Sequence, residues 1–589
     1  MSQRKVFIDA LGKDMANLLW TANTLQVYPA TLQNFSVGSL LPAVIYMFRR
    51  GFRRGQGSFS QAFSPGDNMR PTIWWVSGKL SELSQFEGFD SETSKDILGD
   101  LLLADALENK GGAEGHTSEV QRAFPSHYYS SWLDLPQAVA NLRFVPEMLV
   151  ALLANQKDVE NVGISDGEDF TVGRNPERNP LLRVFEKGVI YGNNAAILAG
   201  GEADDVDGLA DFSLEEWLMV QLGRTCGQSP EKLRAAPSIS ANQPIATGSA
   251  GIFRKDMECL LRHYGLTIPR RGLSPMLECL IGIGLWQTFL SSLGAVIHWE
   301  RHHELPDLED CHSFHMFADA SSGSDPRLRD LAEASGFELI RFIHESTNAL
   351  AVVRVSDAAA RDNLDLVDHV PNVRGLADWL NLLGLVRSGG HSASAFFRQD
   401  VFTKCNRLRN GLIQQNEASE AAELLGSPFA RQNPARALAE ALTLSMGSKM
   451  LQTKYFMFLD SAGMVNEPHG LIKKRKVSRR LESGKTQRGD ARSVILSNAL
   501  LDTLVHTQLA KNRGTVSFQD FLHALKTDYG VLVDEAPKGV AADREDLLRN
   551  RSILEKRLRD LGLLVGVNDA ESMKRLRARY RSPENQPTP

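Results

Sequence analysis

One uncharged, apolar segment near the middle of the chain constrains the fold more than any other feature of the sequence. Residues 276–300 read MLECLIGIGLWQTFLSSLGAVIHWE, with no charge between positions 279 and 297. Ser274 and Pro275 open this segment as an N-cap and a first-turn proline do. A helix that is apolar on every side is either buried in a protein core or spans a membrane.

Length and polarity favour the protein core. The uncharged segment barely reaches the roughly 20 residues that a bilayer requires. Gln287, Thr288, Ser291 and Ser292 lie in its middle, and the sequence contains no second candidate span. The charged N-terminal residues lack the apolar region of a signal peptide. We therefore expect a buried helix in a cytoplasmic protein without membrane attachment.

Charge is distributed unevenly along the 589 residues, a length that predicts about three or four domains. Residues 471–589 contain 24 Lys and Arg against 15 Asp and Glu, which is a net charge of +9. The whole chain has a net charge of −5, so −14 remains for the rest. An acidic body with a basic C-terminal region predicts a surface for nucleic acid or for an acidic partner.

The five cysteines form neither a disulfide framework nor a cysteine-rich zinc module. They are scattered, odd in number and without a CxxC pair, which fits a reducing cytoplasm. They lie at Cys226, Cys259, Cys279, Cys311 and Cys405.

Hydrophobic periodicity predicts a mainly α, multidomain protein with a large acidic helical body and a small α/β element. Strands are expected at residues 72–76 (TIWWV) and 350–355, and within 315–325 (HMFADASSGSD), where a turn and a helix from Pro326 follow. The expected domains are an N-terminal helical region over 1–155, a central helical core over 181–300, a mixed and then helical region over 301–465, a basic linker over 466–492 and a small domain over 493–580.

The small C-terminal domain is expected to contain three helices and a strand. The first helix covers residues 494–510, Ser517 and Asp520 cap the second, and the third runs from Asp543 to a C-cap at Gly562. LLVGV follows as a strand. This order resembles a winged helix–turn–helix domain, which implies that the third helix enters the major groove of DNA or binds a protein partner.

Two groups of basic residues are the predicted nucleic-acid contacts, because Lys and Arg neutralise backbone phosphates. The first group lies in the predicted linker: Lys473, Lys474, Arg475, Lys476, Arg479 and Arg480. The second group lies on the outer face of the third helix: Arg544, Arg549, Arg551, Lys556 and Arg559.

The densest cluster of potential metal ligands, HWERHHELPDLEDCHSFH, begins within the apolar segment at His298. His298 and His302 are one helical turn apart, and one of Cys311, His312 or His315 could complete a tetrahedral zinc site with them. The alternative is a solvated polar connector. Zinc is the one cofactor that the sequence suggests.

A second possible metal site lies in the turn after the expected strand. Asp319 and Ser321 match the Asp-x-Ser-x-Ser pattern, and Gly323 stands in place of the second serine. The turn resembles the metal-ion-dependent adhesion loop of von Willebrand A domains. The alternative is an ordinary strand-to-helix turn that a Ser or Asp side chain caps.

No intact catalytic motif is present. SGKT at residues 483–486 has Arg479 where a phosphate-binding loop needs glycine, and GHSAS at 390–394 lacks the closing glycine of a nucleophile elbow. We expect a non-enzymatic subunit of a larger assembly that binds DNA or a protein partner through its C-terminal domain. The chain resembles accessory subunits of prokaryotic DNA-modification or antiviral defence systems. The alternative is a metal-dependent hydrolase or nuclease centred on residues 298–315.

Overall fold

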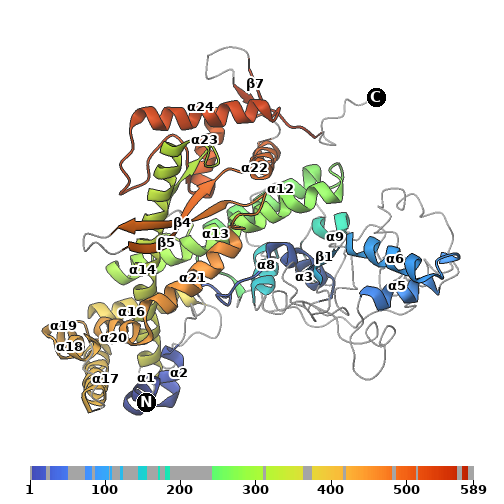
Figure 1. Cartoon of the computed structure of the whole chain (residues 1–589). Coiled ribbons are helices and arrows are strands. Elements are labelled where there is room, and N and C mark those ends of the chain that lie inside the picture. Colours follow the sequence, from blue (N-terminus) through green and yellow to red (C-terminus); the bar gives the residue numbers. More distant parts are fainter. Residues whose placement is uncertain are drawn as a thin grey trace. The chain divides into compact units, whose positions relative to one another are not determined.

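The fold is mainly helical, with a small mixed sheet of four strands (Figure 1). It divides into two units that alternate along the sequence: residues 1–33, 243–253 and 279–579 form the first, and 34–242, 254–278 and 580–589 form the second. The expected domains were continuous segments of the chain, and their boundaries stay predictions. This computed structural model describes residues 3–20, 27–50, 73–82, 86–104, 106–108, 120–123, 144–154, 170, 172, 179–185, 242–309, 314–362, 366, 375–414, 420–480, 486–512, 515–566 and 574–580.

The apolar segment forms most of α13 (Arg270–His302), and all its side chains from position 279 to 297 are buried. The Thr288 and Ser292 hydroxyls donate to the carbonyl oxygens of Gly284 and Thr288, at 2.8 and 2.7 Å. Their polar groups are thus satisfied one turn earlier in the helix. In the described ranges α13 is the one helix long and apolar enough to cross a membrane, and 94% of its most apolar window is buried inside the protein.

The first unit contains a sheet with the order β4–β5–β3–β6. Its strands are β3 (Met316–Asp319), β4 (Ile472–Arg480), β5 (Thr486–Ile495) and β6 (Val531–Leu532). β4 and β5 are antiparallel, whereas β3 runs parallel to both β5 and β6. The carboxyl ends of the three parallel strands therefore meet at one edge of the sheet.

The basic segment predicted as a linker over 466–492 is instead largely the β4–β5 hairpin. Buried or half-buried carboxylates pair with its cations on both faces. Arg475 donates to both carboxylate oxygens of Glu333, at 2.9 and 2.8 Å, while Lys474 lies 3.1 Å from Asp460. Because adjacent strand residues point to opposite faces, the charges that suggested a linker hold the hairpin between two helices.

Those two helices are α14 (Pro326–Arg361) and α21 (Ser448–Ala462). The Asp325 side chain caps α14 by accepting from the backbone N–H groups of Arg327 and Leu328, at 3.0 and 3.4 Å. The prediction of a strand and turn before α14 is confirmed. The strand predicted over 350–355 is wrong, because these residues continue α14. Packing outweighs the strand preference of their β-branched side chains.

The helices around α14 in the first unit agree in position with the helical regions expected from periodicity. They are α1 (Gln3–Leu11), α2 (Lys13–Leu19), α16 (Leu376–Ser388), α17 (Ser394–Gln414), α18 (Glu420–Gly426), α19 (Pro428–Gln432) and α20 (Pro434–Met446).

The second unit is helical where it is described, apart from one short pair of strands. The strand predicted over 72–76 is wrong, because the described part of it begins helix α5 (Ile73–Ser81). The other elements are α3 (Val37–Arg50), α6 (Glu92–Ala104), β1 (Ala106–Glu108), β2 (Val120–Ala123), α8 (Val145–Leu153) and α9 (Pro180–Phe185), and the two units share α12 (Thr247–Tyr264) and α13.

The C-terminal elements of the first unit follow the predicted order. They are α22 (Asn498–Lys511), α23 (Phe518–Tyr529), α24 (Arg544–Asp560), β7 (Leu564–Val565) and β8 (Arg575–Leu576), of which the last two pair in antiparallel fashion. The capping box of Ser517 and Asp520 is confirmed. This region is not detached, because β6 belongs to the main sheet. The winged-helix assignment itself stays a prediction.

Candidate nucleic-acid interface

The inner face of α24 is fixed to the carboxyl edge of the sheet by polar contacts. Asn550 is fully buried, and its side-chain amide donates to the carbonyl oxygens of Ala318 and Val533, both at 2.8 Å. Its oxygen accepts from the backbone N–H of Ala320 at 2.9 Å. The Arg557 guanidinium donates to the carbonyl oxygen of Ala320 at 2.7 Å. Backbone atoms that follow β3 and β6 thereby set the position of the helix.

Burial lowers the pKa of Arg557, and the nearby Asp319 carboxylate opposes that shift. The same guanidinium also donates to the side chains of Ser322, at 3.1 Å, and Asn498, at 2.6 Å. Arg557 therefore acts as a structural cation of the sheet edge. Arg557 is not among the basic residues predicted for the outer face of the third helix.

Helix α24 carries the five predicted basic contacts, of which Arg551 is half-buried, and three of the five are paired within the protein. Arg549 lies 2.7 Å from Asp325, Arg551 lies 3.1 Å from Asp534, and Arg559 lies 2.6 Å from Glu555. Arg544 and Lys556 are exposed and have no acidic partner in the described part of the chain. All five residues thus lie on one helix, and the charges of Arg544 and Lys556 face solvent without an acidic partner in the described part of the chain.

Among the predicted basic contacts on the hairpin, most of those with described side chains form ion pairs or hydrogen bonds within the protein. Lys474 and Arg475 form the ion pairs described above, and Lys473 donates to the carbonyl oxygen of Ser322 at 3.2 Å. Lys476 is exposed and lacks an ion pair in the described ranges. The side chains of Arg479 and Arg480 lie outside the described residues. Most of the described charge in the first group is therefore structural.

Two further arginines near α24 were not among the contacts predicted from the sequence. Arg575 and Arg577 are exposed, whereas Lys574 and Leu576 between and beside them are buried. β8 pairs with β7, which directly follows α24, and Lys574 lies 2.9 Å from Glu555 of α24. The alternation KRLR over 574–577 is the signal that identifies them, because alternate residues of a strand share a face.

In the turn after β3, the candidate metal ligand Asp319 accepts hydrogen bonds from the backbone of the turn itself. Asp319 accepts from the N–H and the hydroxyl of Ser321, at 2.7 and 2.6 Å, and from the N–H of Gly323 at 2.7 Å. The Ser321 hydroxyl in turn accepts from the N–H of Asp325 at 3.0 Å. These bonds are those of a capped strand-to-helix turn.

The histidine cluster remains a prediction as a metal site. The His298 and His302 rings lie side by side with centroids 4.4 Å apart, and burial followed by the charge of His302 lowers the pKa of His298. Burial and Lys526 lower the pKa of His315. Within the described ranges, no three His, Cys, Asp or Glu side chains are grouped as metal ligands. Cys311 and His312 lie outside those ranges.

The sequence matches the family described as methylation-associated defense system protein MAD7 over residues 177–580, more than half of the chain. The chain belongs to this family. No curated protein matches it, and no solved structure matches it. The expectation of a defence-system protein is therefore confirmed at the level of the family.

Both groups of predicted contacts lie inside the part of the chain that matches the MAD7 family. The same is true of α13, the mixed sheet and α24. The family description places the chain in a methylation-associated, multi-gene defence system. It does not identify partners, and it does not describe a winged helix.

Proposed function

We propose that this MAD7-family chain is a DNA-binding subunit of its defence system and that it contacts duplex DNA through the exposed face of α24 and β8. It acts by binding rather than by catalysis, as part of a larger complex in the cytoplasm. The observation that supports this most directly is the placement of Arg544, Lys556, Arg575 and Arg577, whose charges are solvent-facing and unneutralised within the described ranges.

Rigid mounting of α24 supports the proposal. A helix that contacts DNA must hold its register against the backbone, so it needs fixed attachment on the opposite face. Asn550 and Arg557 provide that attachment through hydrogen bonds to β3 and the turn after it. The helix is therefore fixed before DNA arrives, which limits the ordering cost of association.

The composition of the outer face also supports DNA contact. Leu548 is 55% exposed and is flanked on the same face by Ser552 and the basic side chains of α24. Side chains of these types contact phosphates, base edges and the thymine methyl group in DNA grooves. A protein partner would use the same exposed leucine, so a direct DNA-binding measurement has to decide between the two.

The test is duplex binding by fluorescence anisotropy across a salt series, using the full chain. We compare the natural protein with a variant in which four exposed cations become glutamine. We expect weaker binding and a shallower dependence of log K on log salt, by about 0.9 for each phosphate that the variant no longer neutralises. The four substitutions are Arg544→Gln, Lys556→Gln, Arg575→Gln and Arg577→Gln.

A control variant removes the same charge from other exposed sites of the first unit. It should retain the natural salt dependence, because those cations are on other elements. Equal loss of binding in both variants would show that only net charge matters and would overturn the proposed interface, as would no binding by the natural protein at low salt. The control substitutions are Lys5→Gln, Arg301→Gln, Arg341→Gln and Arg407→Gln.

A further inference from the structure

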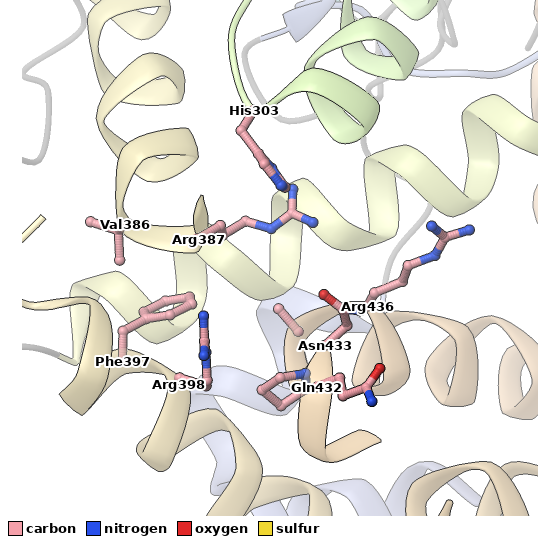
Figure 2. Close-up of a pocket in the computed structure, with 10 residues that line it drawn as sticks. His303, Val386, Arg387, Phe397, Arg398, Gln432, Asn433 and Arg436 are labelled. Atoms are coloured by element: carbon pink, nitrogen blue, oxygen red, sulfur yellow. The ribbon is translucent and has the colours of Figure 1, made fainter. Parts of the chain in front are cut away.

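A pocket between α16, α17 and α20, far from α24 in sequence, is lined by three arginines. It is partly open to solvent. Figure 2 shows Arg387 of α16 beside His303, with Arg398 of α17 below them and the first turn of α20 at the same opening.

Arg387 is the most unusual residue of the pocket, because it is a buried cation with an unused donor. Its side chain is 8% exposed, and its Nη1 has no hydrogen-bond partner. The guanidinium lies over the Trp299 ring, 4.8 Å from its centroid, and its nearest carboxylate, that of Glu300, is 4.0 Å away. Burial lowers the pKa of Arg387 to about 10, so it stays charged at neutral pH. A buried charged donor without an acceptor is costly unless a ligand supplies one.

The first turn of α20 adds backbone donors to the same pocket. Asn433 is the N-cap residue, yet its side chain makes no capping hydrogen bond, and Pro434 follows at the first helical position. Ala435 and Arg436, two residues that also line the pocket, supply the next backbone N–H groups. The first N–H groups of a helix have no acceptor within the helix and carry its positive dipole end, so they bind anions well.

His303 contributes a second unsatisfied polar atom. Its Nδ1 is buried without a hydrogen-bond partner. Its backbone adopts φ of +64°, a conformation that costs free energy for a residue other than glycine. Gly384 of α16 passes so close to the His303 carbonyl that a Cβ there would overlap it. The helix packing thus holds His303 at the pocket.

The other two arginines, Arg398 and Arg436, make the net charge at the pocket opening positive. Arg398 is exposed and has no partner in the described residues, whereas Arg436 lies 3.4 Å from Glu300 and 3.1 Å from Glu440. The two glutamates offset part of the charge, and the three arginines leave one net positive charge. An anion would therefore meet Arg387 and Arg398 together with the α20 backbone.

We propose that this pocket binds the phosphate group of a small phosphorylated molecule. Donors approach from two side chains and one helix start, and a tetrahedral phosphate offers acceptors in all of these directions. A planar carboxylate would satisfy one arginine fork but leave the other donors unused. This site is separate from the proposed DNA-binding face and does not depend on it.

The experiment is isothermal titration calorimetry of the full chain with inorganic phosphate, AMP and adenosine. We expect heat of binding with phosphate and AMP but not with adenosine. Tighter binding of AMP than of phosphate would show that the ligand extends beyond its phosphate group, and equal affinities would show that the phosphate alone is recognised. Either pattern supports the proposal. No binding of phosphate or AMP would overturn it.

Two variants assign the binding to the pocket without disturbing buried contacts. Arg398→Gln removes an exposed donor and should weaken phosphate binding about tenfold, which corresponds to one charge-assisted hydrogen bond. Gln432→Glu places a carboxylate of nearly the same shape at the opening and should weaken binding at least as much. Arg407→Gln on α17 is the matched control and should bind as the natural protein does. Unchanged affinity in both pocket variants would also overturn the proposal.

Discussion

The side-chain amide of Asn550 donates a hydrogen bond to the carbonyl oxygen of Ala318 over 2.8 Å, across a separation of 232 residues in sequence. It joins the helix proposed to contact DNA to β3, one of the two inner strands of the sheet. Because the amide is fully buried, no water replaces this bond if the side chain is removed. The stability of the sheet and the position of α24 therefore depend on one another.

Substitution of Asn550 tests this link. Asn550→Ala leaves the Ala320 N–H and the carbonyls of Ala318 and Val533 without their partner, and should lower the free energy of unfolding by about 3 kcal/mol. Urea denaturation measures the change. Lys556→Ala, on the exposed face of the same helix, should change it by less than about 0.5 kcal/mol.

Close approach of α14 to the sheet makes Gly336 a second sensitive position. A Cβ at Gly336 would overlap the backbone carbonyl of Arg492 in β5, so Gly336→Ala should cost at least about 2 kcal/mol of unfolding free energy. Gly78 in α5 has no atom within 4 Å of such a Cβ. Gly78→Ala should instead stabilise its helix by about 0.5–1 kcal/mol. Destabilisation of similar size at both sites would contradict this explanation.

Asp460 supports the hairpin from α21. It accepts from Arg492 at 2.6 and 2.8 Å and lies 3.1 Å from Lys474. Asp460→Asn would leave the nearly buried Arg492 charge without its carboxylate and should cost about 3 kcal/mol. Hydrogen exchange should show faster exchange of the β4 and β5 amides. Glu467→Gln, on the exposed turn before β4, serves as the control and should leave both measurements unchanged.

Acid sensitivity is expected from Asp528, which lies in the last turn of α23 and pairs with Lys511 of α22. Burial opposes its ionisation, but Lys511, Gln508 and Thr527 together hold its pKa below the usual range. A depressed pKa stabilises the fold above the unfolded value, about 4, and this contribution disappears as the pH falls through the folded value. Asp528→Asn should be less stable at pH 7.

The same variant should also lose less of its stability between about pH 4 and 2. Unfolding curves across this range measure the effect. Asp330→Asn, at an exposed carboxyl on α14, should retain the natural acid response. An unaltered acid response in Asp528→Asn would contradict the assigned role of this carboxylate.

Metal content provides a test of the alternative function. If the chain is the non-enzymatic binding subunit proposed above, we expect elemental analysis of the purified protein to show less than one zinc per chain. Stoichiometric zinc that is lost on His298→Ala and His302→Ala would instead support the metal-dependent hydrolase.

Sequence patterns predicted those elements whose apolar residues face a core. The buried α13, the strand and turn before α14 and the three C-terminal helices all carry that signal. The hairpin was missed because its strands form ion pairs with neighbouring helices: Arg475 faces Glu333, and Arg492 faces Asp460. Charged residues in a strand give the same local pattern as a solvated linker, and only their distant partners distinguish the two.

The arginine pocket was missed for a related reason. Arg387, Arg398 and Arg436 lie on three helices, and no local spacing connects them. Their common feature is a shared opening, which requires the packing of α16, α17 and α20. By contrast, the basic residues predicted on α24 all belong to one helix with one period, so the sequence alone could group them.

The order of the strands has a consequence for synthesis of the protein. β3 is made early but pairs on both sides with strands that follow much later, at residues 494–495 and 531–532. At about 5–20 residues per second, the ribosome needs roughly 10–40 seconds to extend the chain from β3 to β6. Both edges of β3 stay unpaired until β5 has been made, and one edge stays unpaired until β6 has been made, so the nascent chain is vulnerable to wrong pairing. A chain truncated before β6 should therefore aggregate rather than accumulate in soluble form.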